Sequence, residues 1–150
     1  MTDGLTYLAI GNDAFFSEVK KLLAEGKVVR LKARGRSMEP LIREVRDEIV
    51  LSACIEPKKG RIVLARTEEG IVLHRIIGID GNAVTLMGDG NLYKTESCSM
   101  EDVIAGVTRI VRNDKSIDPE CFMEIFKARI WMIARPVRRP LLKIWKTFCK

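Results

Sequence analysis

Two side chains in this chain of 150 residues could act together as nucleophile and base. Ser37 lies in the segment 35–40, GRSMEP, directly after a run of alternating apolar and charged residues. A serine in this position sits on a sharp bend, with its hydroxyl at the end of a strand. His74 is the only histidine, and imidazole ordinarily exchanges protons near neutral pH. The sequence therefore offers one candidate base for one well-placed hydroxyl.

A carboxylate could complete this arrangement. Asp89 lies in the segment 88–91, GDGN, which follows an apolar run. A serine hydroxyl is a weak nucleophile until a base accepts its proton, and a carboxylate can fix the tautomer of that base. Each motif alone also has a structural explanation, because serine, glycine, aspartate and asparagine favour turns. Together they predict a catalytic group of Ser37, His74 and Asp89.

The apolar periodicity predicts the elements that hold these residues. Residues 13–25 have the spacing of an amphipathic helix, and residues 27–34 alternate as a half-buried strand that ends before Ser37. Further short strands are expected at 48–53, 61–66, 70–79, 83–87 and 103–111. Because the connections are short and rich in turn-forming residues, parallel βαβ units are excluded. We expect a mainly β fold of the α+β class, an antiparallel sheet or barrel over residues 27–111.

The end of the chain differs in composition. Residues 112–119 read as a linker, and residues 120–150 as a helix or two, interrupted at Pro136 and Pro140. The whole chain has 26 basic and 20 acidic residues, and the excess of six lies in residues 120–150. We therefore expect a main domain at 1–119, with a helix at 13–25 and a β core at 27–111, and a basic amphipathic tail at 120–150. The tail either packs on the domain or contacts a membrane surface peripherally.

Composition limits the other classes of function. The main body has balanced charge and no recognisable nucleic-acid module, so we expect no nucleic-acid partner. The four cysteines have no CxxC spacing and one histidine to assist them, so we expect no metal site and no cofactor. We find no signal peptide and no apolar run that could cross a membrane. These features favour a cytoplasmic protein, with the tail as its route to a membrane surface.

Five ordered blocks between residues 35 and 91 resemble the clan that contains signal peptidase I and the LexA-type self-cleaving repressors. They are the GRSMEP, DEIV, KGRIV, HR and GDGN segments, which begin at residues 35, 47, 59, 74 and 88. The resemblance implies a β-rich fold and a serine endopeptidase that cuts beside a small residue. Bacterial members mostly use a lysine base, whereas the archaeal and endoplasmic-reticulum branch uses a histidine. This chain has no lysine between Gly60 and Tyr93, so the local base would be His74, as in the histidine branch without its N-terminal membrane anchor.

The orienting acid is less clearly specified. The histidine branch usually has a further aspartate six residues after the first, where this chain has Thr95. The acid could therefore be Asp89, Glu96 or Asp102, and Asp89 ranks first because its motif matches. An extended substrate would pair along the strand before Ser37. The expected substrate contacts are Leu31, Ala33, Gly35, Arg36 and Met38.

Three functions fit these observations. The first is an endopeptidase that processes a leader, signal or precursor peptide through Ser37 and His74. The second is a peptide-binding module on the same fold that has lost catalysis, which the threonine at position 95 favours. The third is a LexA-like autoprotease. The sequence leaves the cleaved peptide and the oligomeric state open.

Overall fold

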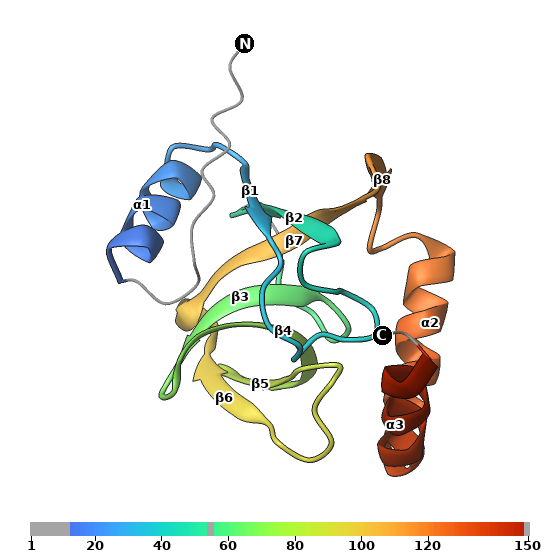
Figure 1. Cartoon of the computed structure of the whole chain (residues 1–150). Helices are drawn as coiled ribbons and strands as arrows, with labels where there is room; N and C mark the ends of the chain where they lie inside the picture. The colour runs from blue at the N-terminus through green and yellow to red at the C-terminus, as the bar shows by residue number, and fades with distance from the viewer. Residues whose placement is uncertain (1–12, 54–55, 149–150) are drawn as a thin grey trace.

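The computed structural model describes residues 13–53 and 56–148 (Figure 1). Its helices are α1 (Asp13–Ala24), α2 (Phe122–Ile133) and α3 (Arg138–Phe148), with short 3-10 turns η1 (Met100–Asp102) and η2 (Arg135–Val137). The strands are β1 (Val29–Lys32), β2 (Asp47–Ser52), β3 (Ile62–Thr67), β4 (Gly70–Asp80), β5 (Ala83–Met87), β6 (Glu96–Ser99), β7 (Val103–Arg112) and β8 (Lys115–Ile117). This is the mainly antiparallel β fold with flanking helices that the sequence predicts.

The strands form one antiparallel sheet in the order β1-β2-β7-β3-β4-β5-β6, and β8 pairs with the C-terminal end of β7. The sheet curls like a half-barrel, so β3 is buried on both faces. Its Ile62 and Leu64 face a core shared with α1, β1, β2 and β7, whereas Val63 and Ala65 face a second core beside β4 and β5. Figure 1 shows α1 on one side of the sheet and the C-terminal helices on the other.

Two strands were not expected from the sequence. β6 lies at Glu96–Ser99, where the residues ESCS have little apolar signal, and it forms by pairing with β5. β8 lies at Lys115–Ile117, within residues 112–119. The prediction that this segment is only a linker is therefore wrong. Asn113 and Asp114 adopt positive φ angles of 49° and 60° there. This geometry makes a tight hairpin that returns the chain along β7.

The C-terminal helices pack on the sheet through a few polar anchors. The helix breaks at η2, where Pro136 lies at the start of the 3-10 turn, whereas Pro140 is accommodated in the first turn of α3. The Trp131 indole donates a hydrogen bond to the Asp89 carbonyl. The Arg138 side chain is buried and donates to the Asn91 carbonyl. Residues 120–148 therefore have an inner face that contacts the β core.

None of the helices that the structure describes combines the length and the apolar character needed to cross a membrane.

Candidate active site

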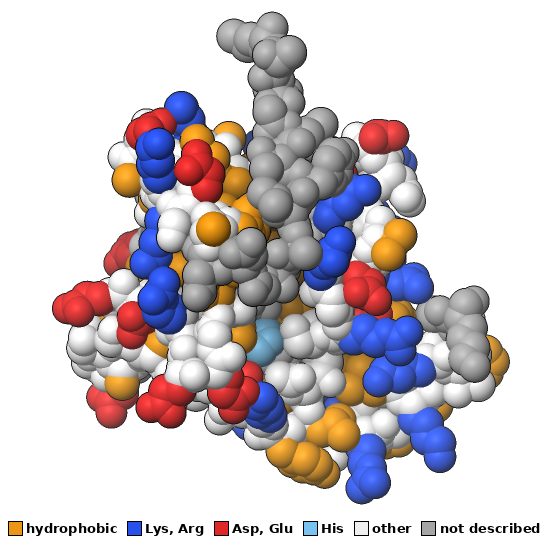
Figure 2. Space-filling view, turned by 60° about the vertical axis from the view of Figure 1, so that its left-hand side comes forward, with side chains coloured by type: hydrophobic (Ala, Val, Ile, Leu, Met, Phe, Trp, Pro, Cys, Tyr) orange, Lys and Arg blue, Asp and Glu red, His pale blue; other side chains and the backbone are white. Residues whose placement is uncertain are grey.

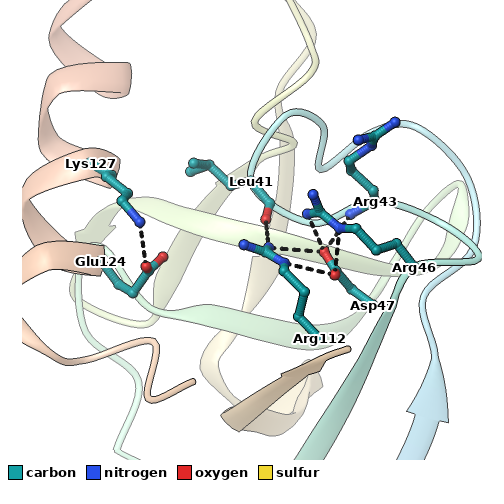
Figure 3. A network of polar contacts seen from close by, with 7 residues as sticks. All are labelled: Leu41, Arg43, Arg46, Asp47, Arg112, Glu124 and Lys127. Carbon is teal, nitrogen blue, oxygen red and sulfur yellow. Dashed lines mark hydrogen bonds and ion pairs between the residues drawn. The ribbon is translucent and has the colours of Figure 1, made fainter. Parts of the chain in front are cut away.

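The loop that carries Ser37 is anchored by Asp47. This carboxylate is fully buried and accepts hydrogen bonds from the guanidinium groups of Arg46 and Arg112 and from the Arg43 amide (Figure 3). Arg112 also donates to the Leu41 carbonyl. The Asp47 backbone carbonyl accepts from the amide of Ala33, the residue that follows β1. Both ends of the loop are therefore tied to β2 and β7.

We predict that this network stabilises the protein against acid. Burial alone would raise the pKa of Asp47, but the hydrogen bonds from Arg46, Arg112 and the Arg43 amide outweigh it and lower that pKa to about 2. A lowered carboxyl pKa stabilises the fold above the ordinary value of 3.8, and this stability is lost as the pH falls from about 4 towards 2. The Asp47→Asn protein should lose about 2 kcal/mol at pH 7 in urea unfolding.

The matched control is Glu68→Gln, which neutralises an exposed carboxylate. It should leave the free energy of unfolding unchanged at pH 7. The difference between wild type and Asp47→Asn should shrink at pH 2. Equal stability of the two proteins at pH 7 would contradict the anchoring role of Asp47.

His74 is held by Glu96 on a neighbouring part of the sheet. The imidazole lies on β4 and is 5% exposed, and its Nδ1 is 2.8 Å from Oε2 of Glu96, the buried first residue of β6. A carboxylate can only accept, so Nδ1 carries the proton in this hydrogen bond. The neutral ring then has its lone pair on Nε2. This is the tautomer that a general base requires.

Asp89 does not contact His74, which corrects our first choice of orienting acid. Its two carboxylate oxygens accept hydrogen bonds of 2.9 and 2.7 Å from Arg75. Consecutive residues of a strand project from opposite faces, so His74 and Arg75 reach different surroundings. The third candidate, Asp102, accepts from the Ser99 hydroxyl and amide at the start of η1. Of the three carboxylates, only Glu96 is placed against the imidazole.

Two glycines allow the loop after β5 to lie against the Ser37 loop. A Cβ built on Gly88 would lie 2.4 Å from the Ser37 carbonyl oxygen and 3.1 Å from His74 Nε2. A Cβ on Gly90 would lie 2.5 Å from the Arg36 carbonyl oxygen. The Gly90 amide donates a 2.7 Å hydrogen bond to the Ser37 carbonyl. Gly88 therefore marks the point where Ser37 and His74, far apart in sequence, come together.

Ser37 and His74 also line one cleft. It has a volume of about 140 Å³ and lies between the end of β1 and the first half of β4, with Ala33, Met38 and Leu73 in its walls. Figure 2 shows the pale-blue imidazole through an opening on this face. Within the described residues, no hydrogen bond joins the Ser37 hydroxyl to the imidazole. Catalytic hydrogen bonds are often long or poorly aligned without a substrate, so this absence is compatible with a catalytic pair of Ser37 and His74.

Three of the five residues expected to contact substrate line the cleft. Ala33, Gly35 and Met38 line the cleft, and Arg36 is exposed beside Ser37. Leu31 is buried in the core shared with α1 and is not among the residues that line the cleft. The Gly35 amide donates to Glu44 at 2.8 Å, so this group is already used within the loop.

A family comparison agrees with this geometry. The family model described as "Peptidase S24-like" matches residues 5–111, a range that includes the Ser37 loop, the His74 strand and the sheet up to the penultimate residue of β7. The chain belongs to the Peptidase S24-like family. Members of this family share the LexA-type peptidase fold, which agrees with the curled antiparallel sheet seen here. Among curated proteins, none matches the chain.

Proposed function

We propose that this Peptidase S24-like protein is a serine endopeptidase that uses Ser37 as nucleophile, His74 as general base and Glu96 as orienting acid. The observation that carries the proposal is the hydrogen bond between His74 Nδ1 and Glu96, which leaves Nε2 beside the Ser37 loop. A base with a fixed tautomer, a partly exposed serine and a shared cleft are the elements that nucleophilic acyl transfer requires.

The reaction follows from these positions. The Ser37 hydroxyl attacks the carbonyl carbon of the scissile bond while Nε2 of His74 accepts its proton. Glu96 stabilises the imidazolium that forms, because its carboxylate is already bound to Nδ1. His74 then returns the proton to the leaving amine, and water hydrolyses the acyl-enzyme by the same route. We assign the developing oxyanion to the Ser37 amide, since the Gly35 amide is bonded to Glu44.

The substrate is proposed to be an extended peptide with a small residue at the cleavage point. β4 pairs with β3 from Gly70 but with β5 only from Arg75 onward, so its edge over residues 71–74 has no strand partner in the described part of the chain. This open edge lies across the cleft from Ala33 and Gly35. A peptide can add its backbone to such an edge. The cleft of about 140 Å³ favours a small side chain.

A library of unmodified peptides tests this proposal, with cleavage products read by mass spectrometry. We expect the wild-type protein to cut a subset of sequences beside small residues. The Ser37→Ala and His74→Ala proteins should fold and produce no specific products. Products that persist in Ser37→Ala would refute the assignment of the nucleophile.

The two alternative functions give different results in the same experiment. A binding module would retain peptides without cutting them, in wild type and Ser37→Ala alike. An autoprotease would release fragments of its own chain during incubation, and Ser37→Ala would prevent this. Intact chains together with cleaved library peptides would support the endopeptidase.

We also propose that the tail contacts a membrane surface. Large apolar side chains of α2, η2 and α3 are exposed at steps of three or four residues: Phe126, Ile130, Ile133, Val137, Leu141, Ile144 and Phe148. Basic residues lie between them, a combination that suits an anionic lipid interface. Such exposed apolar surface is costly in water and is stabilised by contact with lipid.

This contact predicts weaker vesicle binding when the apolar residues become polar. Ile133 and Phe148 are 80% and 82% exposed, so replacing both with serine should preserve the fold. The double variant should sediment at least several-fold less with vesicles containing phosphatidylglycerol than wild type does. The matched control replaces Val28 and Val45, which are exposed outside the helices, and should sediment like wild type. Equal loss in both double variants would contradict a role for the tail.

A further inference from the structure

A large cavity lies between the sheet and the C-terminal helices, apart from the Ser37 cleft. Its volume is about 780 Å³, within the range of ligand pockets in proteins. We call it the helix cavity. Its apolar surface comes from both sides: Ile62, Ile77, Met87 and Val107 on the sheet, with Ala128 and Met132 on α2. This apolar floor is open mainly at Ile77 and at Ile125, Met132 and Ile133 of α2, because Ile62, Met87 and Val107 are only 1–5% exposed.

Basic residues surround the apolar floor. The lining contains seven lysines and arginines and a single acid, Glu120. Glu120 is already paired with Arg61, and Arg75 is paired with Asp89. The other five basic residues have no carboxylate partner among the residues that the structure describes: Lys58, Lys59, Arg129, Arg135 and Arg138. The helix cavity thus has a strong excess of positive charge.

Arg138 shows how far this charge is left uncompensated. The residue is 1% exposed, and its guanidinium donates only to neutral groups, the carbonyls of Trp131 and Asn91 and the sulfur of Met87. Burial and the nearby charges of Arg135 and Arg75 lower the pKa of Arg138, although Asp89 acts in the opposite direction. A buried cation surrounded by other cations is stabilised when an anion enters beside it.

We propose that the helix cavity binds a single-chain anionic amphiphile, with a phosphate or carboxylate head group. The head group interacts with the cations from the 58–59 loop and from α2 and η2. The alkyl chain packs on the open part of the apolar floor, between Ile77 of β4 and the apolar side chains of α2. An inorganic anion would leave the exposed side chains of Ile125 and Ile133 in water, and a neutral lipid would leave the five cations without an anionic partner. Only a ligand with both parts matches both features of the helix cavity.

The helix cavity lies behind the loop that carries Asp89 and Asn91. Ligand binding in this cavity does not depend on the proposed peptidase activity. His74 and Arg75 are neighbours on β4, and they project towards the Ser37 cleft and the helix cavity respectively. Arg75 and Arg138 hold the loop at Asp89 and Asn91, so a ligand in the helix cavity would contact both loop anchors. Binding can therefore be measured equally in the wild-type and Ser37→Ala proteins. A failed peptidase assay would leave this proposal standing.

Dodecyl phosphate below its critical micelle concentration is the probe, and calorimetry of the full chain is the measurement. We expect saturable binding of one molecule per chain and a rise in melting temperature. Inorganic phosphate and dodecanol should each bind at least tenfold more weakly. Similar affinity for dodecanol would refute the role of the cations. Binding that appears only with micelles or vesicles would assign the effect to a membrane surface and overturn the proposal.

Three variants locate the binding site. Replacing Arg129 and Arg135 with glutamine should weaken dodecyl phosphate binding at least tenfold. The matched control replaces Arg139 and Lys143, exposed cations of α3 outside the cavity lining, and should bind like wild type. Met132→Glu places a carboxylate within the helix cavity and should abolish binding. Equal weakening in the two double variants would show that general charge, and not the cavity, attracts the probe.

Discussion

The Glu96→Gln protein should lose between about 10²- and 10⁴-fold in kcat while remaining folded. Glu96 is the carboxylate that contacts the imidazole, at 2.8 Å from Nδ1. A glutamine can donate its amide proton to Nδ1, which favours the tautomer whose Nε2 carries a proton and cannot accept one from Ser37. It also removes the negative charge that stabilises the imidazolium. A peptide cleaved by wild type provides the kinetic measurement.

The Asp89→Asn protein is the matched control, since it also converts a buried carboxylate into an amide. It leaves the buried Arg75 guanidinium without its charged partner, so we expect a loss of stability of about 3 kcal/mol or more. Proton NMR distinguishes the two roles. A strongly downfield signal from the Nδ1 proton of His74 should vanish in Glu96→Gln and persist in Asp89→Asn. The reverse pattern would return the orienting role to Asp89.

The second large effect is expected for Gly88→Ala. The new methyl group would lie 2.4 Å from the Ser37 carbonyl oxygen and 2.9 Å from the side-chain nitrogen Nδ2 of Asn91, so the two loops must separate. Overpacking of this kind costs about 1–3 kcal/mol. Because the same methyl group lies 3.1 Å from His74 Nε2, it also moves the base relative to Ser37. We expect at least 10²-fold lower cleavage in the folded protein.

Gly81→Ala provides a reference for this variant. Gly81 has a positive φ of 57° in the β4–β5 turn, and nothing lies within 4 Å of the position of its Cβ. Its substitution should destabilise the protein through backbone strain alone and leave cleavage by the folded fraction intact. If Gly88→Ala and Gly81→Ala behave alike in activity, the close approach of the two loops is not required for catalysis.

Much of the sheet could be predicted from the sequence because strong local patterns matched the tertiary contacts. The strands β3, β4, β5 and β7 combine apolar β-branched residues with glycine-containing turns, and they form where expected. β6 could not be predicted, since its residues ESCS have no such pattern and pair only because β5 presents a free edge. Because Glu96 begins this strand, the carboxylate that we propose as the orienting acid lies in the segment with the weakest local signal.

The candidate site was also only partly predictable from its sequence motifs. The motifs drew attention to Ser37 and His74, and both residues line one cleft in the structure. The GDGN motif drew attention to Asp89, but its glycines approach Ser37 and His74 whereas its carboxylate binds Arg75. The alternation of side chains along a strand could have indicated this, because His74 and Arg75 project from opposite faces of β4. A carboxylate that binds Arg75 is therefore on the wrong face to bind His74. The linear motif alone does not specify which face a neighbouring loop approaches.

Two side chains of the tail contact the β core, and neither residue type indicates in the sequence that it makes this contact. Trp131 and Arg138 attach the helices to the loop at Asp89 and Asn91. The sequence gives no sign that Arg138 is buried, because arginine is rarely buried without an acidic partner. In the structure it is among the most buried side chains and contacts only neutral groups. A buried arginine without a carboxylate partner is unusual, and Arg138 lines the helix cavity that we propose as an anion-binding site.

The rate at which a fluorophosphonate labels the serine hydroxyl tests the central claim most directly. Such a probe reacts covalently with a hydroxyl that a neighbouring base has activated, and mass spectrometry of the digested protein locates the adduct. We predict a single adduct on Ser37 and at least 100-fold slower labelling in His74→Ala, with both proteins equally folded. Labelling of Ser37 at the wild-type rate in His74→Ala would contradict activation of this serine by the imidazole.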